Sequence, residues 1–131
     1  MFGFEKLDVW QRAVEYAGTI YQVTRSFPDE ERFGLTNQLR RSAVSVSSNI
    51  AEGSSRSSTA DFSRFLEIAY GSLLESVSEL KVAQNQQFLG SGVYENVYNE
   101  AEQVAKMLSG LRRKVRKNPS TIPPTVKNSQ R

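Results

Sequence analysis

The chain has 131 residues, a formal net charge of +3, and neither cysteine nor histidine. A chain of this length suits one domain, which can be stable without disulfides or a structural metal. The two missing residue types exclude Cys/His zinc sites, Cys or His nucleophiles and Ser-His-Asp triads. A cysteine-free chain is compatible with a reducing compartment, so we expect a cytoplasmic protein, and no apolar run reaches the length of a membrane span.

The positive charge is concentrated at the C-terminus. Residues 112–131 hold seven basic and no acidic side chains, which leaves ten basic and fourteen acidic residues in 1–111. The body of the protein is therefore mildly acidic, and the basic character belongs to the C-terminal segment.

Helical periodicity predicts a first amphipathic helix from Leu7 to Thr24, ended by Phe27-Pro28. Its expected buried stripe consists of Leu7, Trp10, Val14, Ala17, Tyr21 and Thr24, widened by Ile20 and Phe27.

The periodicity resumes over residues 35–53 and again from Thr59 to about Phe88, which predicts two further helices. We expect Gly53 to cap the end of the former and Thr59 the start of the latter. Residues 42–48 could form a strand on propensity alone, but a lone strand would have no partner, so helix is preferred. The expected buried stripes are Leu35, Leu39, Ala43, Val46 and Ile50, then Phe62, Leu66, Ala69, Leu73, Val77, Leu80 and Ala83.

A turn at residues 90–92 leads to the last helical pattern, formed by Val97, Ala101, Val104, Leu108, Leu111 and Val115. Four amphipathic helices with short connections predict an all-α, antiparallel up-down-up-down four-helix bundle over residues 1–117. Residues 118–131 are polar, proline-rich and aperiodic, so we predict a disordered basic tail.

A polar row lies beside the apolar stripe of the second predicted helix. Gln, Arg, Ser and Asn side chains in one row are typical of a half-buried contact, and we expect Arg41 to pair with Glu75 of the next helix. We interpret the row as a structural seam within the bundle or between subunits, with a ligand or RNA site as the alternative. The seam residues are Gln38, Arg41, Ser45, Asn49, Glu52 and Glu75.

Gly18, Gly71 and Gly110 fall inside the predicted helices, where each costs about 1 kcal/mol relative to alanine. We expect close approach between helices to offset that cost.

Glu75 and Glu79 lie four residues apart, a spacing that could hold a divalent cation if another helix supplied further carboxylates. A metal-dependent hydrolase is therefore one alternative function. The preferred reading is a non-enzymatic protein, with no cofactor and no small-molecule substrate.

Several segments together resemble the ribosomal-RNA intervening-sequence protein family of bacterial four-helix bundles. They are Arg32-Phe33-Gly34-Leu35, Gln38-Leu39-Arg40-Arg41, Asn49-Ile50-Ala51-Glu52-Gly53 and the Ala69–Glu75 segment with its A-x-G-S-L-x-E pattern. The resemblance covers about residues 5–115, and its one departure is the bulky Tyr70 before Gly71.

The resemblance implies ring-shaped homopentamers, some encoded within inserted segments of large-subunit ribosomal RNA genes. A related protein is the accessory factor of diversity-generating retroelements, where a basic surface serves nucleic acid and reverse transcriptase. The family implies no enzymatic activity.

Five cations occupy six positions at the end of the last predicted helix: Arg112, Arg113, Lys114, Arg116 and Lys117. They could simply complement the helix dipole and aid solubility, or they could bind phosphates with salt-dependent affinity. No aromatic residue lies in this cluster, so contacts to bases are not expected.

These observations favour a cytoplasmic, self-assembling module, expected to be a pentamer, that binds structured RNA or a nucleic-acid enzyme. The first alternative is a purely structural protein–protein adaptor without affinity for nucleic acid.

Overall fold

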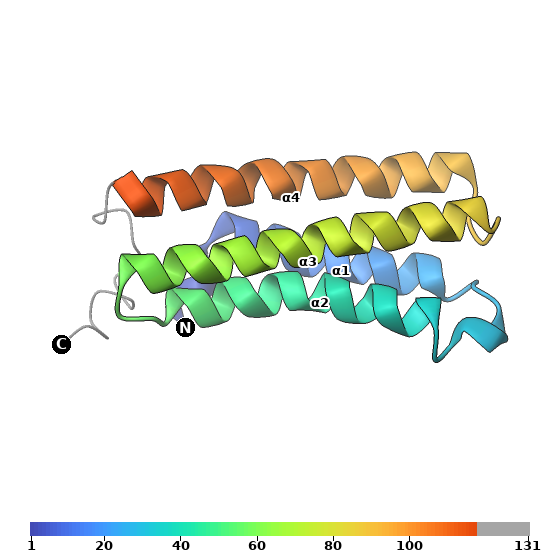
Figure 1. Ribbon diagram of the computed structural model, residues 1–131, viewed down its shortest axis with the longest axis horizontal. Helices are drawn as coiled ribbons and strands as arrows, with labels where there is room; N and C mark the ends of the chain where they lie inside the picture. Colours follow the sequence, from blue (N-terminus) through green and yellow to red (C-terminus); the bar gives the residue numbers. More distant parts are fainter. Residues whose placement is uncertain (118–131) are drawn as a thin grey trace.

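The computed structural model describes residues 1–117, which form four long helices and no strand. In Figure 1 the helix axes run side by side, and each helix reverses the direction of the one before it. The predicted all-α, up-down-up-down bundle is confirmed. The predicted disordered tail, residues 118–131, lies outside the described residues. The elements are η1 (Gly3–Lys6), α1 (Asp8–Thr24), η2 (Asp29–Glu31), α2 (Leu35–Ser54), α3 (Thr59–Asn85) and α4 (Ser91–Lys117).

Each helix packs against its neighbours in the sequence, and α4 closes the bundle against α1. In Figure 1, α2 and α3 lie in front, α1 behind and α4 along the top. The beginnings of α1 and α3 therefore share one end of the molecule with the ends of α2 and α4. None of the helices formed by residues 1–117 is long and apolar enough to cross a membrane.

The core contains the stripes predicted for α2, α3 and α4. Leu39, Leu80 and Leu108, one from each helix, are no more than 1% exposed. This agreement follows from long apolar patterns at a spacing of three and four residues, which fix the inward face of a helix.

The buried face predicted for α1 is partly wrong. Val14 and Tyr21 are 43% and 41% exposed, whereas Tyr16, absent from the predicted stripe, is fully buried. The helix is therefore rotated about its axis relative to the predicted buried face. A tyrosine can occupy the core when its hydroxyl has a hydrogen-bond partner. The buried face consists of Val9, Ala13, Tyr16, Ala17, Ile20 and Thr24.

The Tyr16 hydroxyl forms a buried hydrogen bond with Ser76 Oγ of α3 at 2.7 Å. Ser76 Oγ also lies 2.6 Å from the carbonyl oxygen of Leu73, to which it can donate. Burial, which disfavours the charged phenolate, raises the pKa of Tyr16 to about 12.

Close helix approach occurs at a different glycine from the three expected. A Cβ at Gly53 would lie 2.6 Å from Phe65 Cβ, whereas Gly18 and Gly71 have nothing within 4 Å of that position. At Gly110 the nearest atom, on the side chain of Arg113, is 4.0 Å away. The close-approach expectation for Gly18, Gly71 and Gly110 is therefore wrong, and Gly53 is the helical glycine at which α2 closely approaches α3.

Two helix ends also differ from expectation. Gly53 lies within α2, whose C-cap is Ser55. The N-cap of α3 is Ser58 rather than Thr59, because Ser58 Oγ accepts the N–H of Asp61 at 3.1 Å.

Candidate nucleic-acid interface

The basic residues predicted as phosphate contacts occupy the last two turns of α4. Arg113, Lys114, Arg116 and Lys117 are exposed, while Val115 between them is fully buried in the core. These four cations make no hydrogen bond or ion pair with residues 1–117 that would neutralise them. They complement the partial negative charge at the C-terminal end of α4, and they also remain available to an external anion.

Arg112, the fifth predicted contact, is committed to the bundle. Its Nη2 lies 2.7 Å from Glu67 Oε2, and its Nε donates to Ser63 Oγ at 3.3 Å. Both acceptors belong to α3, so Arg112 joins α3 to α4 near their shared end. A partly exposed pair of this kind contributes little stability, but it fixes the position of the guanidinium.

Two grooves run between α3 and α4 beside these cations. The more enclosed groove has a volume of about 240 Å³, and the shallower one about 430 Å³. The former is lined by Leu66, Tyr70, Leu108, Ser109, Arg112, Arg113 and Arg116. The latter is lined by Thr59, Ala60, Ser63, Arg64, Glu67, Arg112 and Arg116.

Tyr70 and Arg64 of α3 are among the lining residues that sequence reasoning missed. They lie more than forty positions before the basic cluster, and only the antiparallel packing of α3 on α4 brings them to its side. The antiparallel register of the two helices could have indicated them, since residues near the start of α3 must face those near the end of α4.

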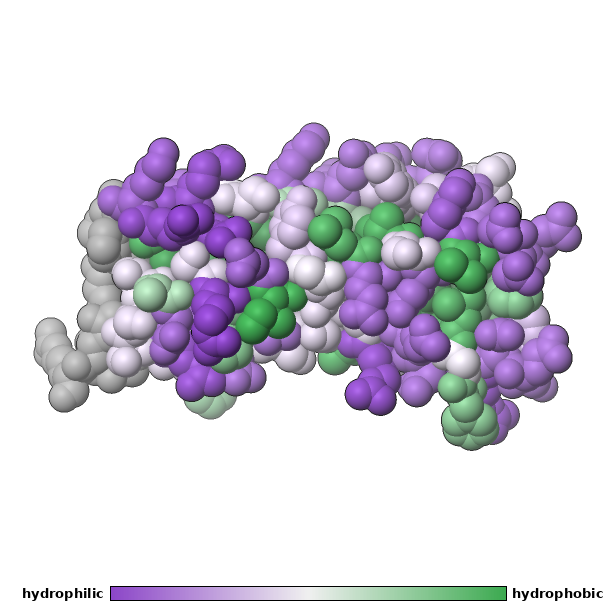
Figure 2. Space-filling model, in the orientation of Figure 1, coloured by the Kyte–Doolittle hydropathy of each residue, from purple (hydrophilic) through white to green (hydrophobic). Residues whose placement is uncertain are grey.

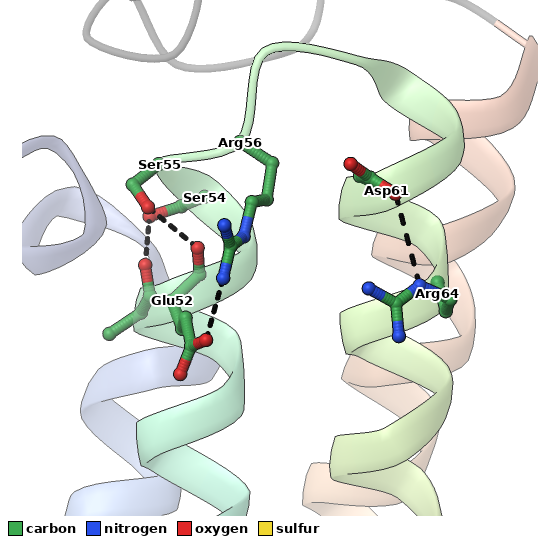
Figure 3. A network of polar contacts seen from close by, with 7 residues as sticks. Glu52, Ser54, Ser55, Arg56, Asp61 and Arg64 are labelled. Atoms are coloured by element: carbon green, nitrogen blue, oxygen red, sulfur yellow. Dashed lines mark hydrogen bonds and ion pairs between the residues drawn. The ribbon is translucent and has the colours of Figure 1, made fainter.

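Arg64 belongs to a second group of charged side chains at the same end of the bundle (Figure 3). The guanidinium carbons of Arg56 and Arg64 lie 4.6 and 4.8 Å from the centroid of the Phe65 ring, within cation–π range. Arg56 Nη2 also contacts Glu52 Oε2 at 2.7 Å, and Arg64 Nε lies 3.8 Å from Asp61 Oδ1. Nearby carboxylates thus offset both cations, unlike the four exposed cations of α4.

The expected ion pair between Arg41 and Glu75 does not form. Arg41 and Glu75 are both exposed, and neither makes an ion pair with another residue in 1–117. Ser42, the next residue along, faces α3 instead and donates to Glu79 Oε1 at 2.8 Å. The prediction was wrong because a rotation of one residue turns Arg41 out of the α2–α3 contact.

The other members of the predicted seam are divided between contact and solvent. Ser45 Oγ lies 2.9 Å from Ser72 Oγ across the α2–α3 contact, and Asn49 Nδ2 donates to the carbonyl oxygen of Ser45 at 2.8 Å. Gln38 is exposed, and Glu52 is held by Arg56.

Glu79 is partly buried beside Ser42. Burial raises the pKa of its carboxyl group, and Glu75 raises it further, while the hydrogen bond from Ser42 opposes both effects. No group of three or more Asp or Glu side chains able to hold a metal ion occurs within residues 1–117. The metal-dependent hydrolase alternative therefore lacks a ligand set in the described part of the chain.

The geometry defines a four-helix-bundle protein with a cationic surface at the end of α4 that residues 1–117 do not neutralise. Comparison with known proteins gives the family. The model of the 23S rRNA-intervening sequence protein family matches residues 5–110, so the chain belongs to that family. No curated protein matches the chain.

A solved structure from Bacteroides thetaiotaomicron VPI-5482 has a similar fold. It is a protein with unknown function from the S23 ribosomal protein family, 25% identical to this chain with a TM-score of 0.72. The similarity covers 80% of this chain and 98% of that one. Neither description names an enzymatic activity.

Proposed function

We propose that the protein is a non-enzymatic, cytoplasmic module that binds structured RNA through the last two turns of α4. The observation that carries the proposal is the set of exposed cations without partners among residues 1–117: Arg113, Lys114, Arg116 and Lys117. Cations that are not neutralised by their own protein gain most from phosphate contact, because binding releases the counterions of the RNA.

Self-association is the second part of the proposal. The surface of α3 carries large apolar side chains: Ile68 is 40% exposed and Leu74 is 53% exposed. Figure 2 shows hydrophobic surface between α3 and α4 near mid-length, beside hydrophilic surface at the end of α4. A mostly apolar groove of about 250 Å³, lined by Leu74, Val77, Tyr98 and neighbouring residues, lies there, and Tyr70 lines both this groove and the more enclosed cationic one. Apolar surface of this kind favours contact between copies, and a homopentamer would present several cationic surfaces to one RNA.

The test is fluorescence anisotropy with a labelled ribosomal-RNA fragment at several salt concentrations. Truncation before α4 ends would remove the buried Val115, so point variants separate charge from packing. The double variant Arg113→Gln/Arg116→Gln removes two cations of the proposed surface. Arg25→Gln/Arg32→Gln, a matched change in exposed arginines at the opposite end of the bundle, is the control.

We expect the Arg113/Arg116 variant to bind more weakly, and the slope of log affinity against log salt to become shallower by about 1.4 to 1.8. The control variant should behave as the wild type. Equal loss in both variants would indicate nonspecific charge attraction. If the wild type does not bind RNA at low salt, the RNA proposal fails, and the structural adaptor or a nucleic-acid enzyme partner becomes the reading to pursue.

A further inference from the structure

We infer that the more enclosed groove between α3 and α4 binds one unpaired nucleotide of an RNA. The base stacks on Tyr70, while Arg113 and Arg116 hold the adjoining phosphates. This inference rests on the proposed function and deepens it by naming the class of RNA: single strands and loops, rather than uninterrupted duplex.

The groove brings an aromatic ring to a cationic cluster that has none of its own. Tyr70 is half-buried and packs against the core, so its ring is held in place before any ligand arrives. Stacking on a fixed aromatic ring tolerates any base, because every base has a π-face. The sequence-based reason for excluding base contacts is thereby removed.

The two walls of the groove differ in chemistry in the way that a nucleotide requires. Tyr70 supplies most of the apolar wall, because Leu66 and Leu108 are each only 1% exposed, and the arginines of α4 form a cationic one. A nucleotide likewise joins a flat, weakly polar base to an anionic phosphate. The volume of about 240 Å³ is below the range of about 300–1,000 Å³ typical of sites for drug-sized ligands, which suits a fragment as small as one base.

The arginines of the groove have different parts in this arrangement. Arg112 is held by Glu67 and Ser63, so it shapes the groove, while Glu67 offsets its charge. Arg113 and Arg116 are exposed and have no polar partner among residues 1–117, so both can turn to phosphates. A-form duplex would offer them phosphates but hides the faces of its bases from Tyr70. Only an unpaired nucleotide uses both walls.

The first experiment changes the RNA and leaves the protein intact. The full chain is titrated against a short single-stranded oligoribonucleotide, the same strand with abasic sugars in place of all its bases, and a duplex of equal length. The strand is kept near the minimum binding length so that the groove has few alternative bases. We expect the abasic strand to bind about 5- to 150-fold more weakly, the range of one stacked base. Equal affinity for the intact and abasic strands would overturn the inference.

The second experiment changes the tyrosine. Tyr70→Phe keeps the ring and should bind the single strand like the wild type, whereas Tyr70→Leu should lose affinity for the single strand and keep its affinity for duplex. Tyr21→Leu, at an exposed tyrosine on α1, is the matched control and should bind normally. Thermal melting of each variant verifies that the bundle is folded.

The outcomes separate the two proposals. If RNA binding depends on Arg113 and Arg116 but Tyr70→Leu leaves single-strand affinity unchanged, the nucleotide site is refuted and the proposed function stands. If the wild type binds neither single strand nor duplex at low salt, both are refuted. A second copy covering the groove would also abolish the Tyr70 effect, and would count against the nucleotide site.

Discussion

Gly53 and Gly71 provide a matched test of the packing between α2 and α3. Both lie inside long helices, and neither has a positive φ. Replacement by alanine should therefore gain up to about 1 kcal/mol of helix propensity at either site. At Gly71 the new Cβ would meet nothing within 4 Å, so Gly71→Ala should stabilise the protein by about 0.5–1 kcal/mol.

At Gly53 the same methyl group enters occupied space. It would lie 2.6 Å from Phe65 Cβ and 3.2 Å from Phe62 Cδ1. A Cβ atom cannot move away by a change of rotamer, so α2 and α3 must separate, and overpacking of this kind costs about 1–3 kcal/mol. Because the propensity gain is similar at both sites, Gly53→Ala should be less stable than Gly71→Ala by about that amount.

Urea unfolding followed by far-UV circular dichroism measures the difference. The experiment is repeated at two protein concentrations, because a subunit interface over Gly71 would make the effect of Gly71→Ala depend on dilution. If Gly53→Ala is as stable as Gly71→Ala at both concentrations, the close contact at Gly53 does not constrain the bundle and the reasoning is refuted.

Two further predictions concern polar contacts. Tyr16→Phe removes the hydrogen bond to Ser76 and should lower the free energy of unfolding by about 0.5–1.5 kcal/mol in urea titrations near neutral pH. The folded-state pKa of Tyr16, about 12, exceeds the ordinary tyrosine value of about 10, so its contribution is fully present below pH 10 and is lost as the pH rises toward 12. The stability difference between wild type and Tyr16→Phe should therefore shrink as the pH rises from about 10 to about 12, and a constant difference would contradict the assignment. Ser58→Ala removes the side-chain cap of α3 and should cost about 1 kcal/mol, whereas Ser57→Ala, one position earlier, should change the unfolding midpoint little.

The sequence was sufficient to predict the four-helix bundle because the apolar periodicity is long and regular in three of the helices. It failed for α1, where Tyr16 is buried through a hydrogen bond to Ser76, a partner sixty residues away in the sequence. Periodicity reports which residues share a face, but the rotation of that face depends on such distant partners.

The candidate site was likewise predicted only in part from the sequence. The basic run near the end of α4 is visible in the sequence, and the structure places its cations on the surface as a group. The groove beside the basic run could not be predicted, because the position of Tyr70 relative to Arg113 depends on the register between α3 and α4. The failed pairing of Arg41 with Glu75 shows that an error of one residue in rotation is enough to lose a specific contact.

The order of the helices in space has a consequence for how the chain acquires its structure. Short links, residues 55–58 and 86–90, join α2 to α3 and α3 to α4, so each pair can associate with a small loss of chain entropy. The contact of α1 with α4 joins distant parts of the sequence, as do the smaller contacts of η1 with α2 and of Tyr16 with Ser76. Helical bundles dominated by local contacts fold within microseconds to milliseconds. The bundle can thus be complete soon after α4 is synthesised, which leaves little time for its exposed apolar faces to meet those of unfolded chains.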